Sequence, residues 1–341
     1  MKTILLQEPK NFQMIDTPEP GKPGPGEALL RVHSVGICGT DYSGYLGKMP
    51  FYTYPRIPGH ELGVEIAALG EGVTHVQVGD RCCVEPYINC QKCHSCERGH
   101  TNACEFNKTL GVMADGGLRK YFILPARKLF PSKKLTFEQL ALVETLAIGS
   151  HAVNRAKAMP GENALIIGAG PIGLSNLEFI KVAGCRPIVM DMNEQRLAFV
   201  RDKMNVKDTI LAKGDGKELD ALKELTNGRL AHVVIDATGS NASMSNAYNF
   251  VGYAGRLVFV GITMSEVVFK HPLMHRHEMT FLASRNALPG DFANTIRLIE
   301  EGKIDTKPWI THQAPLEGMI DVFPQWLKPE TGVIKAVVAV G

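Results

Sequence analysis

The stretch between residues 164 and 191 constrains the fold more than any other feature of the chain. It begins with an apolar run at 164–167, typical of a buried strand, followed by glycines spaced G-x-G-x-x-G. From Pro171 apolar residues recur near helical spacing, and a second apolar run ends at Asp191, eighteen residues after Gly173. A strand, a glycine turn, a helix and a second strand in this order predict a βαβ unit.

This βαβ unit predicts a dinucleotide site, with the pyrophosphate on the exposed N–H groups where the helix starts. Asp191 stands where an acidic residue hydrogen-bonds the adenosine ribose, and its charge would repel a 2′-phosphate. We therefore expect NAD rather than NADP. Arg196 either offsets part of that repulsion or is a solvated helix charge. The candidate cofactor residues at the turn are Gly168, Gly170, Pro171, Ile172 and Gly173.

The rest of the chain suggests two domains in an α/β fold. Further strand-like runs at 232–239 and 255–262, with helix-compatible sequence between them, predict a doubly wound parallel sheet over residues 151–288. Residues 1–150 carry short alternating runs punctuated by Gly and Pro, and predict a β-rich domain. Residues 289–341 contain a helical pattern and a final strand.

Four of the eight cysteines lie within fifteen residues, at Cys90, Cys93, Cys96 and Cys104. The spacing C-x2-C-x2-C-x7-C suits four thiolates around one structural Zn²⁺. An iron–sulfur cluster is the main alternative, but its common run has three residues before the fourth cysteine and a proline after it. Two disulfides would close very short loops, and a reducing compartment disfavours them.

Charge and hydropathy exclude several classes of protein. The formal net charge is +2, with 37 basic and 35 acidic residues, so no electrostatic signature of nucleic-acid binding is present. No apolar stretch approaches the length of a membrane span, and the apolar run near the start is too short for a signal peptide. We expect a cytoplasmic protein without a membrane or nucleic-acid partner.

A second group of metal-ligating residue types lies upstream of the cysteine cluster. Cys38 in GICGTD, and His60 with Glu61 in PGHELG, offer a thiolate, an imidazole and a carboxylate. Catalytic zinc sites draw on this mixed set, whereas a lone Cys or His is more often a packed or loop residue.

The order of these motifs resembles the zinc-containing medium-chain alcohol and polyol dehydrogenases. The likeness runs over the whole chain and rests on GICGTD, the GHE stretch ending in VGDR, the four cysteines, DGGLRKYFILPARKLF, the glycine turn and FVGI. It implies a GroES-like catalytic domain, a Rossmann domain, a C-terminal segment that returns to the catalytic domain, and an active site in the cleft between domains.

The resemblance also implies roles for single residues. Cys38 and His60 become catalytic zinc ligands, Glu61 ligates or orients, and Asp41 hydrogen-bonds the ligating histidine. Glu144 matches the glutamate of the sorbitol and threonine dehydrogenase branch, although a glutamate stabilised by a helix N-terminus is an alternative. Thr40 would pass the substrate proton outward, but Ser43 stands where many relatives have the next relay histidine. The residues implied beside the nicotinamide are Gly261, Ile262, Ser284 and Arg285.

Together these features predict an enzyme with one catalytic and one structural Zn²⁺ that transfers a hydride from a secondary alcohol of a polyol or sugar acid to NAD. Within the family, L-galactonate and L-idonate 5-dehydrogenases are the nearest likeness. The alternatives are a zinc-free NADPH enone or quinone reductase of the same superfamily, or a non-catalytic cofactor-binding scaffold. We expect a homodimer or homotetramer. Candidates to meet substrate hydroxyl or carboxylate groups include Tyr45, Tyr54 and Arg56.

Overall fold

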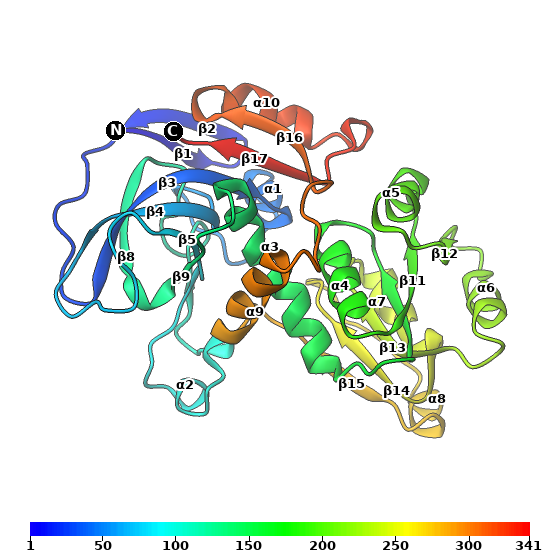
Figure 1. The fold of residues 1–341 in the computed structure, drawn as a ribbon. Helices are drawn as coiled ribbons and strands as arrows, with labels where there is room; N and C mark the ends of the chain where they lie inside the picture. Colours follow the sequence, from blue (N-terminus) through cyan, green and yellow to red (C-terminus); the bar gives the residue numbers. More distant parts are fainter. The chain divides into compact units, whose positions relative to one another are not determined.

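The computed structural model describes all 341 residues, which divide into two compact units (Figure 1). Unit 1 comprises Met1–Glu144 and Ala287–Gly341, and unit 2 comprises Thr145–Asn286. Helix α3, Phe137–Ala156, contains the first boundary, whereas the sequence places that boundary at residue 150. The helix contains one glycine, Gly149, five residues after the boundary, so no glycine or proline marks the change of unit at residue 144 itself.

Unit 1 is built on a seven-stranded sheet in the order β16-β17-β3-β4-β5-β9, with β8 also paired to β3. Strands β1 and β2 form a separate antiparallel hairpin. The strands are β1 Lys2–Glu8, β2 Asn11–Asp16, β3 Glu27–Ile37, β4 Glu61–Leu69, β5 Arg81–Val84, β8 Tyr121–Pro125, β9 Leu129–Pro131, β16 Ile310–Pro315 and β17 Lys335–Ala339. The helices are α1 Gly39–Tyr45, α2 His94–Glu97, α9 Pro289–Glu300 and α10 Met319–Trp326, with short 3₁₀ turns at Thr101–Ala103, Ala126–Lys128, Leu316–Gly318 and Pro329–Thr331.

Strand β3 shows why this sheet forms and how it assembles the site. Ala28, Leu30 and Val32 are fully buried and alternate with partly buried residues, as the period-two pattern requires. Near its end β3 pairs with β4 on one side, Gly36 opposite Glu61, and with β17 on the other. Two segments far apart in sequence, the starts of β4 and β17, therefore lie beside the end of β3.

The four-cysteine segment is a loop between two very short strands. Strand β6, Tyr87–Ile88, pairs antiparallel with β7, Lys108–Thr109, and Tyr87 lies opposite Thr109. All four cysteines lie between these strands, together with α2 and the 3₁₀ turn at Thr101–Ala103. A ladder of two residue pairs is weak by itself, so the strand pair depends on further contacts within the loop that it closes.

Unit 2 is a six-stranded parallel sheet in the order β12-β11-β10-β13-β14-β15. Its strands are β10 Asn163–Ile167, β11 Arg186–Asp191, β12 Thr209–Leu211, β13 Ala231–Asp236, β14 Val251–Phe259 and β15 Thr280–Ala283. Its helices are α4 Pro171–Val182, α5 Glu194–Met204, α6 Glu218–Leu225, α7 Asn241–Asn246 and α8 His271–Arg276, with a 3₁₀ turn at Ala247–Phe250. The β-rich unit and this Rossmann sheet confirm the predicted fold class.

The strand order places the predicted dinucleotide site. From β10 the chain moves outward to β11 and β12, then returns to β13 on the other side of β10. Ligands of doubly wound sheets bind at the carboxyl ends of strands where the order reverses, and the glycine turn follows β10 at this point. Each unit has its own apolar core, around Leu30 and Leu62 in unit 1 and around Leu165 and Val234 in unit 2.

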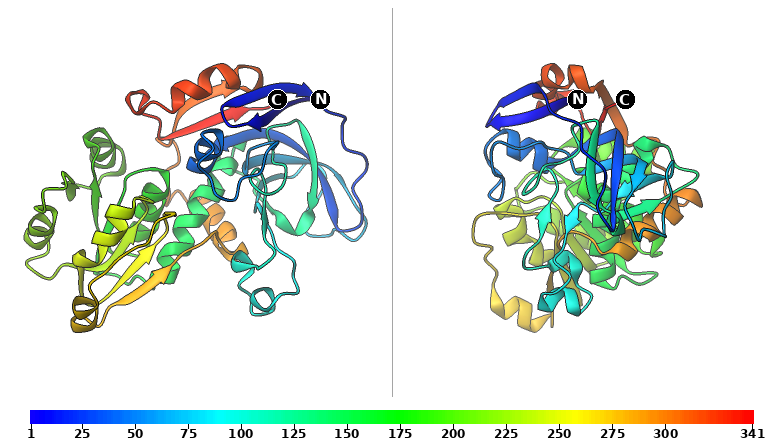
Figure 2. Two further views of the ribbon diagram at one scale, coloured as in Figure 1. Left: turned by 180° about the vertical axis from the view of Figure 1, so that it is seen from behind. Right: turned by 90° about the vertical axis from the view of Figure 1, so that its left-hand side faces the viewer.

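Both chain ends belong to unit 1 and lie near one another in the two views of Figure 2. Among the helices, none combines the length and the apolar character that a membrane span needs.

Candidate active site

Cys38 is held at the N-terminus of α1 by its own helix cap. Its Sγ accepts a hydrogen bond from the backbone N–H of Thr40 at 3.1 Å, and Asp41 Oδ2 accepts one from the backbone N–H of Cys38 at 3.0 Å. This reciprocal capping fixes the thiol direction. Burial raises the pKa of Cys38, so the thiolate needs a nearby cation to persist.

His60 lies immediately before β4 and meets Cys38. His60 Nε2 is 3.1 Å from Cys38 Sγ, and the His60 side chain is buried. On the other side of the ring, Nδ1 lies 4.0 Å from Asp41 Oδ1, and both atoms are buried without a hydrogen-bond partner. Asp41 therefore faces the ring nitrogen it is expected to orient, at a separation longer than a hydrogen bond.

Glu61 is the first residue of β4 and is engaged by a buried lysine. Lys335 Nζ lies 2.7 Å from Oε1 and 2.8 Å from Oε2 of Glu61, and both side chains are almost fully buried. Although burial alone lowers the pKa of Lys335, the Glu61 charge raises it above its usual value. Glu61 is thus part of a buried ion pair whose two oxygens share one cation.

Glu144 belongs to the same cluster but has a different partner. It is the eighth residue of α3, beyond the first turn, so the helix dipole does not explain its position. The Tyr87 hydroxyl donates a hydrogen bond to Glu144 Oε1, and both side chains are buried. Burial raises the pKa values of both Glu144 and Tyr87, and Tyr87 therefore remains a neutral donor.

These side chains form two overlapping groups with the donor chemistry of a metal centre. One group is Cys38, Asp41 and His60, the other is His60, Glu61 and Glu144, and within each the ligand atoms lie within 4.8 Å of one another. A thiolate, an imidazole and a carboxylate suit Zn²⁺ and neutralise it. The buried unpaired His60 and Asp41 atoms also fit a ligating histidine with a carboxylate behind it. The residues fit a catalytic zinc ion.

The four cysteines of the β6–β7 loop converge in the same way. Cys90, Cys93, Cys96 and Cys104 have sulfur atoms within 4.8 Å of one another, and every cysteine of the chain is a free thiol. The backbone N–H of Cys96 lowers the pKa of Cys93 to about 6, while burial raises that of Cys104 to about 11. Four sulfur donors of this kind fit a closed tetrahedral zinc site.

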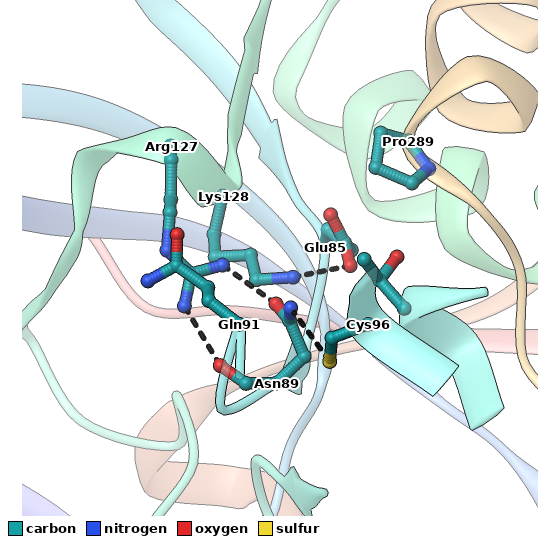
Figure 3. A pocket seen from close by; sticks show the side chains of 8 residues that line it. Glu85, Asn89, Gln91, Cys96, Arg127, Lys128 and Pro289 are labelled. Carbon is teal, nitrogen blue, oxygen red and sulfur yellow. Dashed lines mark hydrogen bonds and ion pairs between the residues drawn. The ribbon is translucent and has the colours of Figure 1, made fainter. Parts of the chain in front are cut away.

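A cavity of about 360 Å³ lies beside this loop (Figure 3). Asn89 connects the loop to the cavity wall. Its Nδ2 donates to Cys96 Sγ at 3.5 Å, and its Oδ1 accepts from Arg127 Nη1 at 2.6 Å. A buried ion pair, Lys128 with Glu85, forms another part of the wall. The lining residues are Glu85, Asn89, Gln91, Cys96, Thr101, Arg127, Lys128 and Pro289.

In unit 2 the glycine turn has the close packing that its sequence requires. Gly168 has φ of 98°, in the left-handed region that favours glycine, and a Cβ at Gly173 would lie 1.6 Å from the Gly168 carbonyl oxygen. Asp191 Oδ2 accepts from the backbone N–H of Ala169 at 2.6 Å. Gly170 caps α4, with Pro171 and Ile172 as its first residues. The acidic residue at the end of β11 therefore also braces the turn.

The remaining predicted cofactor residues lie around the same sheet. Arg196 Nη1 is 4.0 Å from Asp191 Oδ2. Gly261 and Ile262 follow β14, and Ile262 is 64% exposed. Ser284 follows β15 directly, with Arg285 next in the chain, and the Ser284 hydroxyl is buried without a hydrogen-bond partner.

The polar residues considered for substrate binding have partners within unit 1. Arg56 binds Asp115 at 2.8 Å and Thr53 at 2.6 Å. The Tyr54 hydroxyl donates to the carbonyl oxygen of Gly44, and Tyr45 stacks on Phe12 with ring centroids 5.1 Å apart. These contacts favour structural roles for the three side chains.

Sequence reasoning assigned no role to Lys335 or Tyr87. A lysine inside the apolar stretch GVIKAVVAV is a signal, since a buried cation needs a buried partner. Tyr87 gives no comparable signal, because a tyrosine in a short strand is commonly a packing residue.

Two family models match the chain, one within unit 1 and the other mostly within unit 2. The model of the alcohol dehydrogenase GroES-like domain matches residues 24–134, and that of zinc-binding dehydrogenases matches residues 171–301. The chain belongs to the zinc-type medium-chain alcohol and polyol dehydrogenase family, which confirms the resemblance seen in the sequence.

Individual relatives cover nearly the whole chain. The L-galactonate-5-dehydrogenase of Escherichia coli (strain K12) is 37% identical over 339 residues, which is 99% of this chain and 98% of the relative. The D-arabinitol dehydrogenase 1 of Uromyces fabae is 31% identical over 93% of this chain and 91% of its own. A crystal structure from E. coli CFT073, described as a short chain alcohol dehydrogenase complexed with NADH, matches with TM-score 0.92 and 27% identity, covering 100% and 99% of the two chains.

Proposed function

We propose that this protein oxidises a secondary alcohol of a sugar acid or polyol to a ketone, with NAD as hydride acceptor. The observation that carries the proposal is that two groups of metal-ligating side chains share the buried His60, one with Cys38 and the other with Glu144, in a member of the zinc-type alcohol and polyol dehydrogenase family. The fold family and the dehydrogenase names of its relatives support the reaction class.

Cys38, His60 and Glu144 would hold the catalytic zinc, and Cys90, Cys93, Cys96 and Cys104 the structural one. The bound zinc supplies a Lewis acid that makes the alcohol proton more acidic, and the nicotinamide accepts the hydride. Glu61 is paired with Lys335 on both oxygens, which supports a charge-balancing role for it. Asp41 accepts a hydrogen bond from the Cys38 backbone. Thr40, the second residue of α1, would pass the substrate proton outward.

Asp191 supports NAD over NADP. Its two oxygens accept backbone N–H groups of Ala169 and Asn193, so the carboxylate is fixed at the end of β11 where the ribose is expected. Arg196, 4.0 Å away, is half-exposed and leaves room for a weaker use of NADP. Gly261, Ile262, Ser284 and Arg285 would border the nicotinamide.

The proposed substrate is an aldonate close to L-galactonate. This proposal rests on the relative that is 37% identical over nearly the whole chain. We also propose a homo-oligomer, because β15 is an unpaired edge of the six-stranded sheet and exposed apolar side chains such as Val268 lie in the segment before it. The eight free thiols are consistent with a cytoplasmic protein.

The test is NAD⁺ reduction by the purified protein over hexitols, aldonates including L-galactonate and L-idonate, threonine and simple alcohols. Each substrate is run before chelator treatment, after it, and after zinc restoration, with NADP⁺ in parallel. We expect activity on one sugar acid that disappears with chelator and returns with zinc. Chelator-insensitive reduction of enones by NADPH, or cofactor binding without turnover, would contradict the proposal.

A further inference from the structure

The hydroxyl of Tyr87 makes one directed contact with the candidate metal site. It donates a hydrogen bond to Glu144 Oε1, and the Tyr87 and Glu144 residues are only 2% and 5% exposed. The bond is therefore shielded from water, where a hydrogen bond to a charged group contributes more than an exposed one. The bond engages Oε1 of a carboxylate that also belongs to the ligand group of His60 and Glu61.

The strand that carries Tyr87 is fixed from the four-cysteine loop. Tyr87 pairs with Thr109 across the β6–β7 ladder, and Cys90 follows this strand by two residues. The backbone N–H of Cys90 donates to Cys104 Sγ at 3.3 Å, which ties the start of the loop to its end. The Tyr87 ring also packs edge-on against Phe292 of α9, with centroids 6.3 Å apart. Both ends of the side chain are thus constrained.

The neighbouring carboxylate, that of Glu61, is paired with a cation instead of a neutral donor. Both Glu61 oxygens lie within 2.8 Å of Lys335 Nζ, whereas Glu144 has a neutral donor on a single oxygen. A neutral donor fixes the orientation of a carboxylate without cancelling its charge. Of the two glutamates, Glu144 is therefore the one whose hydrogen bond comes from a neutral donor rather than from a buried lysine, and it belongs to the same ligand group as His60.

We propose that Tyr87 is a positioning residue that holds Glu144 so that one oxygen faces the Cys38–His60 metal site, and that the four-cysteine loop keeps Tyr87 in place. The inference rests on the proposed function, in which Cys38, His60 and Glu144 hold a metal ion. It assigns the loop a role at the other metal site in addition to closing its own segment.

The test is Tyr87→Phe in the full-length protein, with Co²⁺ as the probe metal at the mixed site. Metal affinity is measured by chelator competition, and the Co²⁺ visible spectrum reports the ligand geometry. We expect about tenfold to a hundredfold weaker binding, as for other groups that orient a ligand, together with an altered spectrum. Metal at the four cysteines should be unchanged.

Tyr52→Phe is the matched control. Tyr52 is also a buried tyrosine of unit 1, 7% exposed, and its hydroxyl has no hydrogen-bond partner. Removing that hydroxyl should leave the affinity and the Co²⁺ spectrum unchanged. A thermal melt of each variant separates loss of fold from loss of orientation.

A double-mutant cycle with Glu144→Ala keeps the inference testable if Tyr87→Phe is less stable. In the Glu144→Ala background, Tyr87→Phe should weaken the mixed site no further, because the carboxylate it orients is absent. Independent effects of the two substitutions, or a Tyr87→Phe protein with wild-type affinity and spectrum, would overturn the inference. A wild-type protein that binds metal only at the four cysteines would instead contradict the proposed function.

Discussion

The two candidate metal sites of unit 1 differ in how their ligands are obtained. The four cysteines come from one fifteen-residue loop, and their sulfur atoms need only local turns to meet. The mixed site takes Cys38 from the start of α1, His60 from the residue before β4 and Glu144 from the middle of α3. The first site can order a loop, whereas the second exists only when the sheet and α3 have already packed.

Each site also has its own buried Lys–Glu pair. Lys335 pairs with Glu61 at the mixed site, and Lys128 pairs with Glu85 beside the four-cysteine loop, with all four side chains at most 2% exposed. The second pair lines the cavity of Figure 3, while the first lies against the candidate ligands themselves. The molecule therefore has two ion pairs of the same kind. The Lys128–Glu85 pair lies in a cavity wall, and the Lys335–Glu61 pair lies beside the candidate metal ligands.

The largest expected contrast is between Cys38→Ser and Cys93→Ser. Cys38→Ser should lower kcat by roughly three orders of magnitude with the melting temperature nearly unchanged, because the Lewis-acid contribution is several kcal/mol. Cys93→Ser should mainly lower the melting temperature or the degree of assembly, since it opens the loop. Steady-state kinetics and thermal melts on both variants measure the contrast.

If Tyr87 is positioned by the loop, Cys93→Ser should also weaken metal binding at the mixed site, but far less than Cys38→Ser does. Equal loss of turnover in two well-folded variants would contradict the division between the sites.

The second contrast is between Lys335→Met and Lys128→Met. Each leaves a buried glutamate without its cation, and each should lower the free energy of unfolding by about 3–5 kcal/mol. Only Lys335→Met should also change metal affinity and the Co²⁺ spectrum at the mixed site, because it releases Glu61 toward the ligands. Denaturant melts and chelator competition provide the two measurements.

The matched rescue is Lys335→Met combined with Glu61→Gln, which removes the unpaired charge and should regain much of the lost stability. An altered Co²⁺ spectrum in Lys128→Met, or an unaltered one in Lys335→Met, would contradict the prediction that only the Lys335–Glu61 pair influences the mixed metal site.

Features that depend on neighbouring residues could be predicted from the sequence, whereas contacts between distant residues could not. The glycine turn and the cysteine loop are local patterns, so the Rossmann sheet and the four-thiolate site could be predicted from spacing. The partners of the two glutamates are not local: Lys335 is 274 residues from Glu61, and Tyr87 is 57 residues from Glu144. Only the sheet order, with β17 and β4 on the two sides of β3, brings Lys335 to Glu61.

A third contrast concerns metal removal. On the proposed function, four thiolates would form a closed shell, whereas the mixed site would have fewer soft ligands and an open position, so the mixed site should lose its metal first. Stepwise dialysis against a chelator, with total zinc and activity measured in parallel, should show activity lost at about half of the total zinc. Activity that persists until the second zinc equivalent leaves would reverse the assigned roles.

The smallest expected effect is at Asn89, which joins the loop to the cavity. Asn89→Ala removes the hydrogen bond to Cys96 Sγ and the side-chain acceptor of Arg127. The bond from Arg127 to the Asn89 backbone carbonyl, the four ligands and the β6–β7 ladder remain. Because this N–H···S hydrogen bond is long, at 3.5 Å, we expect it to contribute only about 1 kcal/mol, which gives roughly fivefold faster release of the loop zinc and an unchanged kcat. A zinc-release assay with a colorimetric chelator measures this. Gln91→Asn is the control, since Gln91 lines the same cavity but is exposed. Equal acceleration in both variants would mean that general loosening of the loop, rather than the Cys96 hydrogen bond, governs zinc release, and Arg127 would then have no connection to the metal.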